Sequence, residues 1–195
     1  MKTFRTMTQV LLTLMVAFLS LDAVAVAADL PGDSIYRLSF ALTDQNGKNF
    51  HLVDRHGKPQ LVSMFYTSCP YVCPLVIDTL KKTQHELSPE ESAQLQVLLV
   101  SFDPERDTAQ RLKETFDERK VDAQTWTMAR TEARGVRKLA AALGVQYREL
   151  ANHEINHSVA LVLLDGDGRI VATTDKYGVV DPDFVAEVHK LLAPR

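Results

Sequence analysis

The amino-acid sequence predicts an α/β fold, in which helices cover both faces of one sheet. Two largely apolar runs, at residues 61–66 and 96–102, have the length and composition of buried strands. A segment with helix signals follows each of them. The chain then closes with two more apolar runs joined by a glycine-rich turn, and with a final helix. Strands that alternate with helices in this way indicate a covered sheet.

The N-terminal segment, residues 1–28, predicts a cleaved secretory signal peptide. Lys2 and Arg5 precede an apolar run at 10–21, and small residues follow that run. The alternative is an uncleaved membrane anchor, but the run is shorter than the about 20 residues that a bilayer requires. Residues 29–195 contain no visible linker or repeat and suffice for one domain with a sizeable core. We therefore expect a single exported domain, located in the bacterial periplasm.

The charge balance argues against nucleic-acid binding. The whole chain has a formal net charge of −3. Removing the leader takes away two basic residues and one acidic residue, so the predicted domain is slightly more acidic. No basic patch stands out, and a mildly acidic surface has no electrostatic attraction for phosphate.

A β-hairpin is expected at the start of the domain. Residues 36–42 alternate between apolar and polar side chains, as a strand with one buried face does. The Asn-Gly pair at 46–47 favours a tight turn into a second strand at 50–53. His51 and His56, which lie near this hairpin, are interpreted as surface residues.

Capping patterns locate the helices. Residues 88–91 form a capping box with proline at the first helical position, and Gly144 is a stop signal. The charged turn at 103–108 caps the next helix, and its side chains are interpreted as loop and cap residues. Its place at the end of a buried strand leaves a role at the rim of a site open. One helix is predicted at 75–80, and a short helix begins at 89. The others are predicted at 108 to about 120, at about 132 to 143, and at 181 to 192.

The remaining strands complete the fold. The turn at 165–168 resembles part of a calcium loop but lacks the glutamate of an EF-hand, so we interpret it as a hairpin turn. Trp126 is expected in the core. The predicted strands lie at 125–129, 145–150, 158–164 and 169–174. This order of elements is that of a thioredoxin-like fold with an N-terminal β-hairpin extension.

Cys69 and Cys73 are the only cysteines of the chain. They stand at i and i+4 where a buried strand turns into a helix, so a helix that opened at Cys69 would carry both sulfurs on one side of its first turn. A helix N-terminus also favours thiolate over thiol. A disulfide across three residues stabilises a fold weakly, so a redox-active disulfide or a metal site is the better interpretation. Two structural buried cysteines are the alternative.

His157 is the histidine expected to matter. It lies just before the penultimate strand, and in a thioredoxin-like fold that position is beside the first turn of the cysteine helix. Taken alone, a single histidine is more often structural. His153, four residues earlier, is interpreted as a surface residue, although the sequence leaves open whether it could act as a ligand.

Four motifs then occur in a characteristic order: YTSCPYVCP at 66–74, VSFDPERDT at 100–108, NHS at 156–158 and DGDG at 165–168. Together they resemble the Sco/SenC family of copper proteins, over the chain from about residue 40 to its end. The resemblance implies that Cys69 and Cys73 are thiolate ligands and that His157 is an imidazole ligand. One copper ion per chain is implied, as Cu(I) or as Cu(II).

The resemblance also implies partners. A Sco-like protein would deliver copper to the copper-A centre of cytochrome c oxidase subunit II during assembly. It would receive the ion from an upstream periplasmic copper donor and depend on a thiol reductant of the thioredoxin-like type. Tyr71 departs from the family, since many members have an acidic residue between the cysteines. Many members are also tethered to the membrane, whereas this leader looks cleavable.

Two other functions are compatible with the cysteines. A thiol-disulfide oxidoreductase would use Cys69 and Cys73 and would not need His157. A peroxidase is the weaker alternative, because Thr67 stands two residues before Cys69 where a Thr-x-x-Cys element requires three. The resemblance favours a copper chaperone, and whether the protein also acts as an enzyme is left open.

Overall fold

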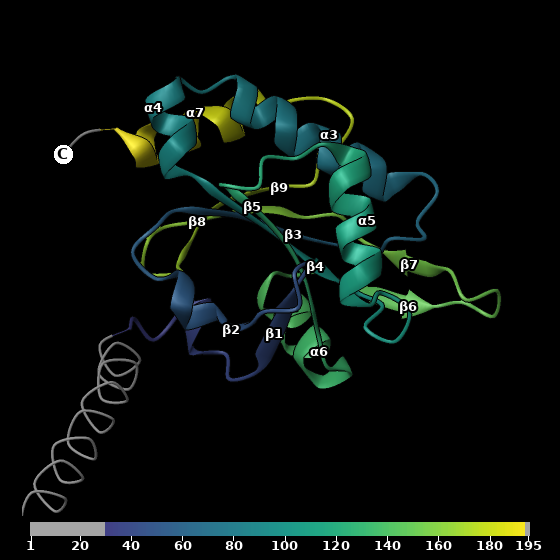
Figure 1. Ribbon diagram of the computed structural model, residues 1–195. Coiled ribbons are helices and arrows are strands. Elements are labelled where there is room, and N and C mark those ends of the chain that lie inside the picture. Colours follow the sequence, from purple (N-terminus) through teal and green to yellow (C-terminus); the bar gives the residue numbers. More distant parts are fainter. Residues whose placement is uncertain (1–29, 194–195) are drawn as a thin grey trace, which may run out of the picture.

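The structure is a computed structural model that describes residues 30–193. Its main feature is a seven-stranded sheet in the order β2-β1-β5-β4-β3-β8-β9 (Figure 1). The predicted signal peptide lies outside the described residues. Within residues 30–193, no helix has the length and apolar character needed to cross a membrane.

The strands are β1 (Ala41–Asp44), β2 (Asn49–His51), β3 (Gln60–Phe65), β4 (Gln96–Ser101), β5 (Trp126–Thr131), β6 (Tyr147–Glu149), β7 (Ile155–His157), β8 (Leu161–Leu164) and β9 (Ile170–Thr174). The α-helices are α3 (Val72–His85), α4 (Pro89–Gln94), α5 (Ala109–Arg119), α6 (Ala133–Ala142) and α7 (Pro182–Leu192). Two short 3₁₀ helices are η1 (Ile35–Arg37) and η2 (Leu52–Arg55).

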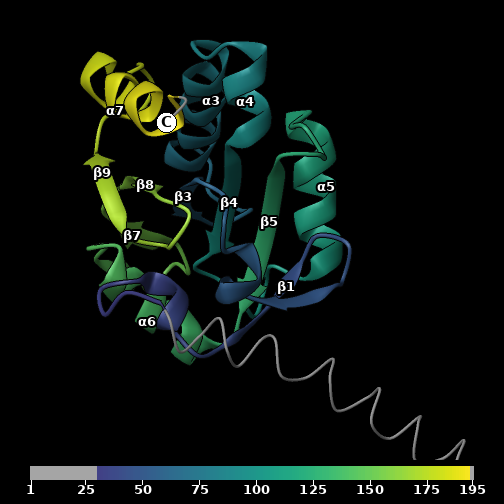
Figure 2. The same ribbon diagram turned by 90° about the vertical axis from the view of Figure 1, so that its left-hand side faces the viewer.

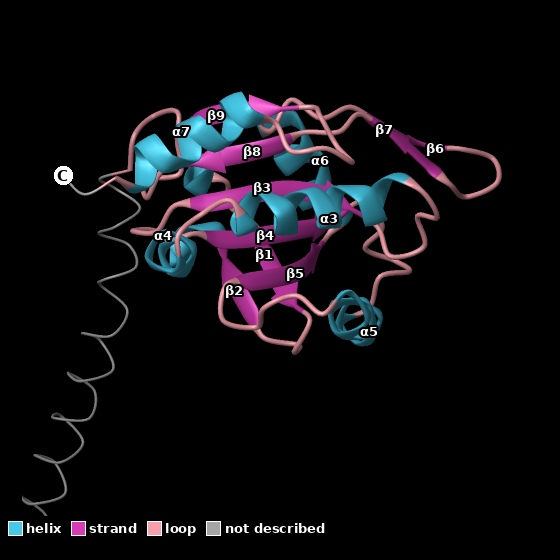
Figure 3. Cartoon of the chain, turned by 90° about the horizontal axis from the view of Figure 1, so that it is seen from above, coloured by secondary structure: helices cyan, strands magenta, loops and turns pink. Residues whose placement is uncertain are grey.

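Three parallel strands form the centre of the sheet. β3 pairs with β4, and β4 pairs with β5, both in parallel. Every residue of β3 is buried. Helices α3 and α7 lie on one side of the sheet and α6 on the other (Figures 1 and 2). Seen from above, α3 lies over β3 and β4, and α7 lies over β8 and β9 (Figure 3). Central strands buried on both faces need continuous apolar sequence, which is why these two runs were recognisable.

Two antiparallel hairpins flank this centre. β1 and β2 form the first, and β1 adds antiparallel to β5. β8 and β9 form the second, and β8 adds antiparallel to β3. The thioredoxin-like fold with an N-terminal hairpin extension is therefore confirmed. The turn at 46–47 is confirmed too, because Gly47 has a φ of 79° and Asp44 accepts hydrogen bonds from the backbone N–H groups of Asn46 and Lys48.

The strand predicted at 36–42 is wrong over residues 36–40. Residues 35–37 form η1, capped by Ser34, and the strand begins only at Ala41. Ile35 and Tyr36 are both buried, an arrangement that a strand with only one buried face does not allow. The predicted strand at 50–53 likewise ends at His51, and η2 begins at Leu52.

Strands β6 and β7 form a separate two-stranded sheet. The sequence predicted a strand at 145–150, which is β6, but it placed the next strand at 158–164. In the structure β8 covers only 161–164, and residues 155–157 form β7. β7 is three residues long and pairs only with β6 among the described strands. This small hairpin extends beyond the main sheet (Figures 1 and 3) and ends in His157.

Candidate metal centre

Cys69 and Cys73 lie in the segment that joins β3 to α3. The helix begins at Val72 with Tyr71 as its N-cap, so Cys69 precedes the helix and does not open it. Cys73 lies in the first turn. Its backbone N–H donates to Sγ of Cys69 at 3.3 Å. The two sulfurs are therefore adjacent, as the spacing predicted, but through a turn before the helix.

Both thiols are free and buried. A hydrogen bond with Cys73 lowers the pKa of Cys69, an effect that burial opposes. The same bond with Cys69, together with burial, raises the pKa of Cys73. These opposite directions favour a thiolate at Cys69 and a protonated thiol at Cys73 in the reduced pair. Deprotonated sulfur is the form that attacks disulfides and binds metals.

His157 faces these sulfurs from the end of β7. Its Nε2 atom is 3.9 Å from Sγ of Cys73, although 84 positions separate the two residues. Its Nδ1 atom is 3.0 Å from the carbonyl oxygen of Ser158. A carbonyl oxygen can only accept, so Nδ1 carries the proton and the lone pair of Nε2 points toward the thiols. One donor atom from each of Cys69, Cys73 and His157 lies within 4.8 Å of the others.

Two aromatic rings hold the imidazole in place. Phe102, just after β4, packs against His157 with ring centroids 4.7 Å apart. Tyr66, just after β3, contacts the same ring edge-on at 6.1 Å. The hydroxyl of Tyr66 also accepts a hydrogen bond from the backbone N–H of Ile155 in β7. Sequence reasoning did not assign these roles; the available signal was an aromatic residue at the carboxyl end of each buried strand.

Asp107 supports the cysteine loop from a buried position. It was interpreted as a loop or cap residue, but its side chain accepts hydrogen bonds from the backbone N–H and the hydroxyl of Thr67 and from the hydroxyl of Ser101. Thr67 lies two residues before Cys69. Asp103 is buried as well and pairs with Arg106. The turn at 103–108 therefore forms part of the surroundings of the site.

The other singled-out residues lie away from the three donor atoms. His51, His56 and His153 are exposed, as expected, and His153 pairs with Glu149. Trp126 is buried, as expected. Tyr71, between the cysteines, is 77% exposed, so its ring is available to solvent or to a partner beside the site.

The donor set decides which ions fit. Two soft sulfur ligands and one imidazole suit Cu(I) or Zn(II). A structural zinc site uses four protein ligands. Among residues 30–193, Cys69, Cys73 and His157 form the one cluster of three or more such groups, and it contains no carboxylate. A cavity of about 230 Å³ opens beside Cys69 and His157. The centre thus has three protein donors and an accessible side, which suits an ion that is passed on.

Comparison with known proteins gives one family match, to SCO1/SenC over residues 28–193. A Stutzerimonas stutzeri protein named for copper binding is 27% identical over 135 residues, covering 66% of this chain and 64% of that protein. SCO2 of Saccharomyces cerevisiae mitochondria is 28% identical over 135 residues, covering 68% of this chain and 45% of that one. The matches thus span less than two thirds of these relatives' lengths. The crystal structure of Arabidopsis thaliana ScoI with copper bound has the same fold, with a TM-score of 0.68, 22% identity, and coverage of 77% of this chain and 96% of that one.

Proposed function

The chain belongs to the SCO1/SenC family, and from that premise we propose that it is a copper chaperone. It binds one copper ion through the thiolates of Cys69 and Cys73 and the imidazole of His157. It then delivers the ion to the copper-A centre of cytochrome c oxidase subunit II during assembly of the oxidase. The observation that carries the proposal is the convergence of these three donor atoms within 4.8 Å.

The spacing of the donors is suited to one ion. With metal–sulfur and metal–nitrogen bonds of about 2.3 and 2.05 Å, two ligands on a three- or four-coordinate ion lie roughly 3.6 to 3.8 Å apart. The Sγ atom of Cys73 and the Nε2 atom of His157 are 3.9 Å apart. Small side-chain adjustments would therefore suffice for binding. The copper-binding name of one relative and the copper in the Arabidopsis structure support copper over zinc.

The proposed pathway has three further parts. The protein is exported to the bacterial periplasm, with residues 1–28 acting as a cleaved signal peptide and residues 29–195 as the single mature domain. An upstream periplasmic copper donor supplies the ion. In an oxidising compartment, two adjacent thiols form a disulfide. A reductant of the thioredoxin-like type therefore returns Cys69 and Cys73 to the thiol state before copper is loaded.

Metal analysis of the reduced, leader-free protein tests the proposal. After exposure to Cu(I) or to Zn(II) followed by desalting, we expect one copper ion per chain and much less zinc. The substitution His157→Ala should abolish tight copper binding, since only the two cysteines would remain as protein ligands. His56→Ala is the matched control and should bind copper like the unmodified protein, because His56 is exposed and pairs with Asp167 in the β8–β9 turn. Equal copper affinity in His157→Ala and the unmodified protein would refute the proposal.

A second candidate, thiol-disulfide exchange, is favoured by the state of the two thiols. The pKa of Cys69 is lowered and that of Cys73 is raised, which is the division between an attacking thiolate and a protonated partner. This activity does not require an imidazole ligand. We therefore expect His157→Ala to keep nearly all disulfide-reducing activity while losing copper. Loss of both activities would mean that His157 serves the thiol chemistry itself.

A further inference from the structure

The position of His157 depends on how the β6–β7 hairpin is attached. Among the described strands, β7 pairs only with β6, so no main-sheet strand holds the hairpin through a ladder of hydrogen bonds. His157 is its last residue, whereas Cys69 and Cys73 belong to the β3–α3 connection. The three donors converge only while the hairpin lies against the end of β4.

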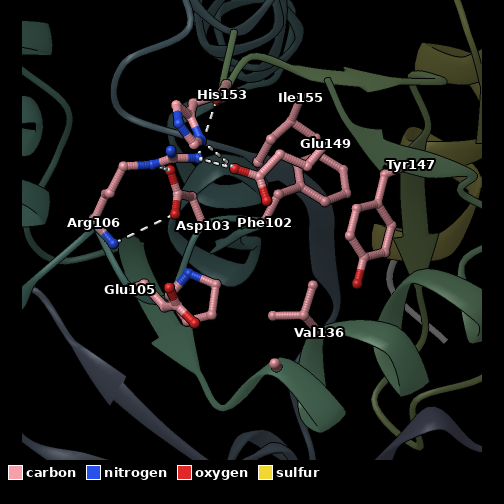
Figure 4. Close-up of a pocket in the computed structure, with 11 residues that line it drawn as sticks. Phe102, Asp103, Glu105, Arg106, Val136, Tyr147, Glu149, His153 and Ile155 are labelled. Carbon is pink, nitrogen blue, oxygen red and sulfur yellow. Dashed lines mark hydrogen bonds and ion pairs between the residues drawn. The ribbon is translucent and has the colours of Figure 1, made fainter. Parts of the chain in front are cut away.

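Close packing accounts for only part of that attachment. A cavity of about 440 Å³ lies between the hairpin, α6 and the end of β4 (Figure 4). Tyr147 and Ile155 line it from the hairpin, and Val136 lines it from α6. Phe102 contacts the ring of Tyr147, with centroids 5.2 Å apart. Because side chains do not fill the space, dispersion contacts across it are lost, and other interactions must contribute to holding the hairpin.

Arg106 makes such an interaction across the rim of the cavity. Its guanidinium pairs with the buried Asp103 at the end of β4. The same group reaches Glu149 Oε1 of β6 at 3.4 Å and the backbone carbonyl oxygen of His153 at 3.1 Å. Figure 4 shows these groups meeting on one side of the cavity. His153 lies in the hairpin turn, with a left-handed φ of 63°. One side chain thus joins the main domain to both the strand and the turn of the hairpin.

We propose that Arg106 is a positioning residue that holds the β6–β7 hairpin in place and thereby sets how tightly His157 completes the metal centre. The inference rests on the proposed copper function. Without the guanidinium, the hairpin would spend part of its time away from β4. The apparent affinity for the ion would then fall by the fraction of molecules in which His157 faces the thiols. Arg106 itself would not touch the metal.

Competition for Cu(I) against a chromophoric chelator measures this effect on the reduced protein. Arg106→Gln is expected to weaken copper binding about tenfold, and Arg106→Lys about threefold, because an ammonium keeps the charge but cannot span the same partners. Arg111→Gln is the matched control. Arg111 pairs with Glu114 on the surface of α5, away from the hairpin, and its loss should leave the affinity unchanged. Hydrogen exchange of the β7 amides should quicken in Arg106→Gln alone.

The decisive measurement repeats Arg106→Gln in a His157→Ala background. If Arg106 acts through His157, adding Arg106→Gln to the His157→Ala variant causes no further loss of copper affinity. An equal loss in both backgrounds would overturn the inference, since it would reflect general destabilisation. If His157→Ala weakens binding but Arg106→Gln does not, the inference fails and the proposed function stands. If His157→Ala has no effect, both fail.

Discussion

Asp107 offers the sharpest test of how the strand ends support the cysteine loop. Asp107 is only 1% exposed, and its carboxylate accepts three hydrogen bonds, two from Thr67 and one from Ser101. Thr67 begins the loop that leads to Cys69. The substitution Asp107→Ala removes all three acceptors at once, and the backbone N–H of Thr67, unlike the two hydroxyls, cannot rotate toward another partner.

The expected loss of stability follows from these bonds. A hydrogen bond to a charged group contributes about 1.5 to 3 kcal/mol, and a buried donor left without an acceptor costs about 1 to 3 kcal/mol. Hydroxyl rotation and the relief of a buried charge offset part of this. We therefore expect Asp107→Ala to lower the free energy of unfolding by about 3 kcal/mol. For a domain of this size, that corresponds to a fall in Tm of roughly 6 to 12 °C. Asp107→Asn should lose about half as much.

Urea unfolding of the reduced, metal-free protein, followed by circular dichroism, measures the change. Asp117→Ala is the control, because Asp117 pairs with Lys113 on the exposed surface of α5. Exposed pairs of this kind contribute about 0.3 to 0.5 kcal/mol. If Asp107→Ala cost no more than Asp117→Ala, the buried carboxylate would have no supporting role, and the reasoning would be refuted.

Two further predictions concern the scaffold. Gly135→Ala should destabilise the protein by about 1 to 3 kcal/mol, because the added methyl group would lie 2.5 Å from Oγ1 of Thr131 and 3.1 Å from the ring of Phe40; a gain in Tm, usual for this change in a helix, would contradict the packing described. The pKa of Asp181, which caps α7, is lowered chiefly by its hydrogen bond with Lys176, so its contribution to stability is present above about pH 4 and is lost as the pH falls through the folded pKa. The stability difference between the unmodified protein and Asp181→Asn should therefore shrink on acidification, and a difference that grew at low pH would reverse the assigned sign.

The helices were predictable because their signals are local. Ser88 and Glu91 form the predicted capping box, with each side chain bonded to the other residue's backbone N–H. Gly144 adopts a φ of 70° immediately after the C-cap of α6. Such bonds join residues three or four apart, so they are already specified by neighbouring letters of the sequence.

The first turn of the domain was not predictable in the same way. The segment at 36–42 alternates like a strand, yet Tyr36 is 3% exposed within a 3₁₀ helix. Its ring lies so close to Gly168 that a Cβ there would come within 2.6 Å of it. Gly168 belongs to the β8–β9 turn at the other end of the chain. Burial against a distant residue outweighed a weak local pattern.

For the candidate site, the chain's spacing placed Cys69 beside Cys73, while the position of His157 in a thioredoxin-like fold and the resemblance to a family pointed to His157. The ligand roles of all three stay predictions. The approach of the His157 imidazole to the two thiols required the folded chain. So did the packing of Phe102 on the imidazole and the link from Arg106 to the hairpin. No period or spacing in the sequence marks contacts between residues so far apart.

By itself, the sequence determined the elements whose bonds and apolar periods are local: the buried central strands, the capped helices and the adjacency of two thiols. Only the tertiary structure decided where the imidazole lies, which carboxylates are buried and how the hairpin is attached. The physical reason is that these features depend on closing long loops, and the free energy for that comes from burial shared across the whole core.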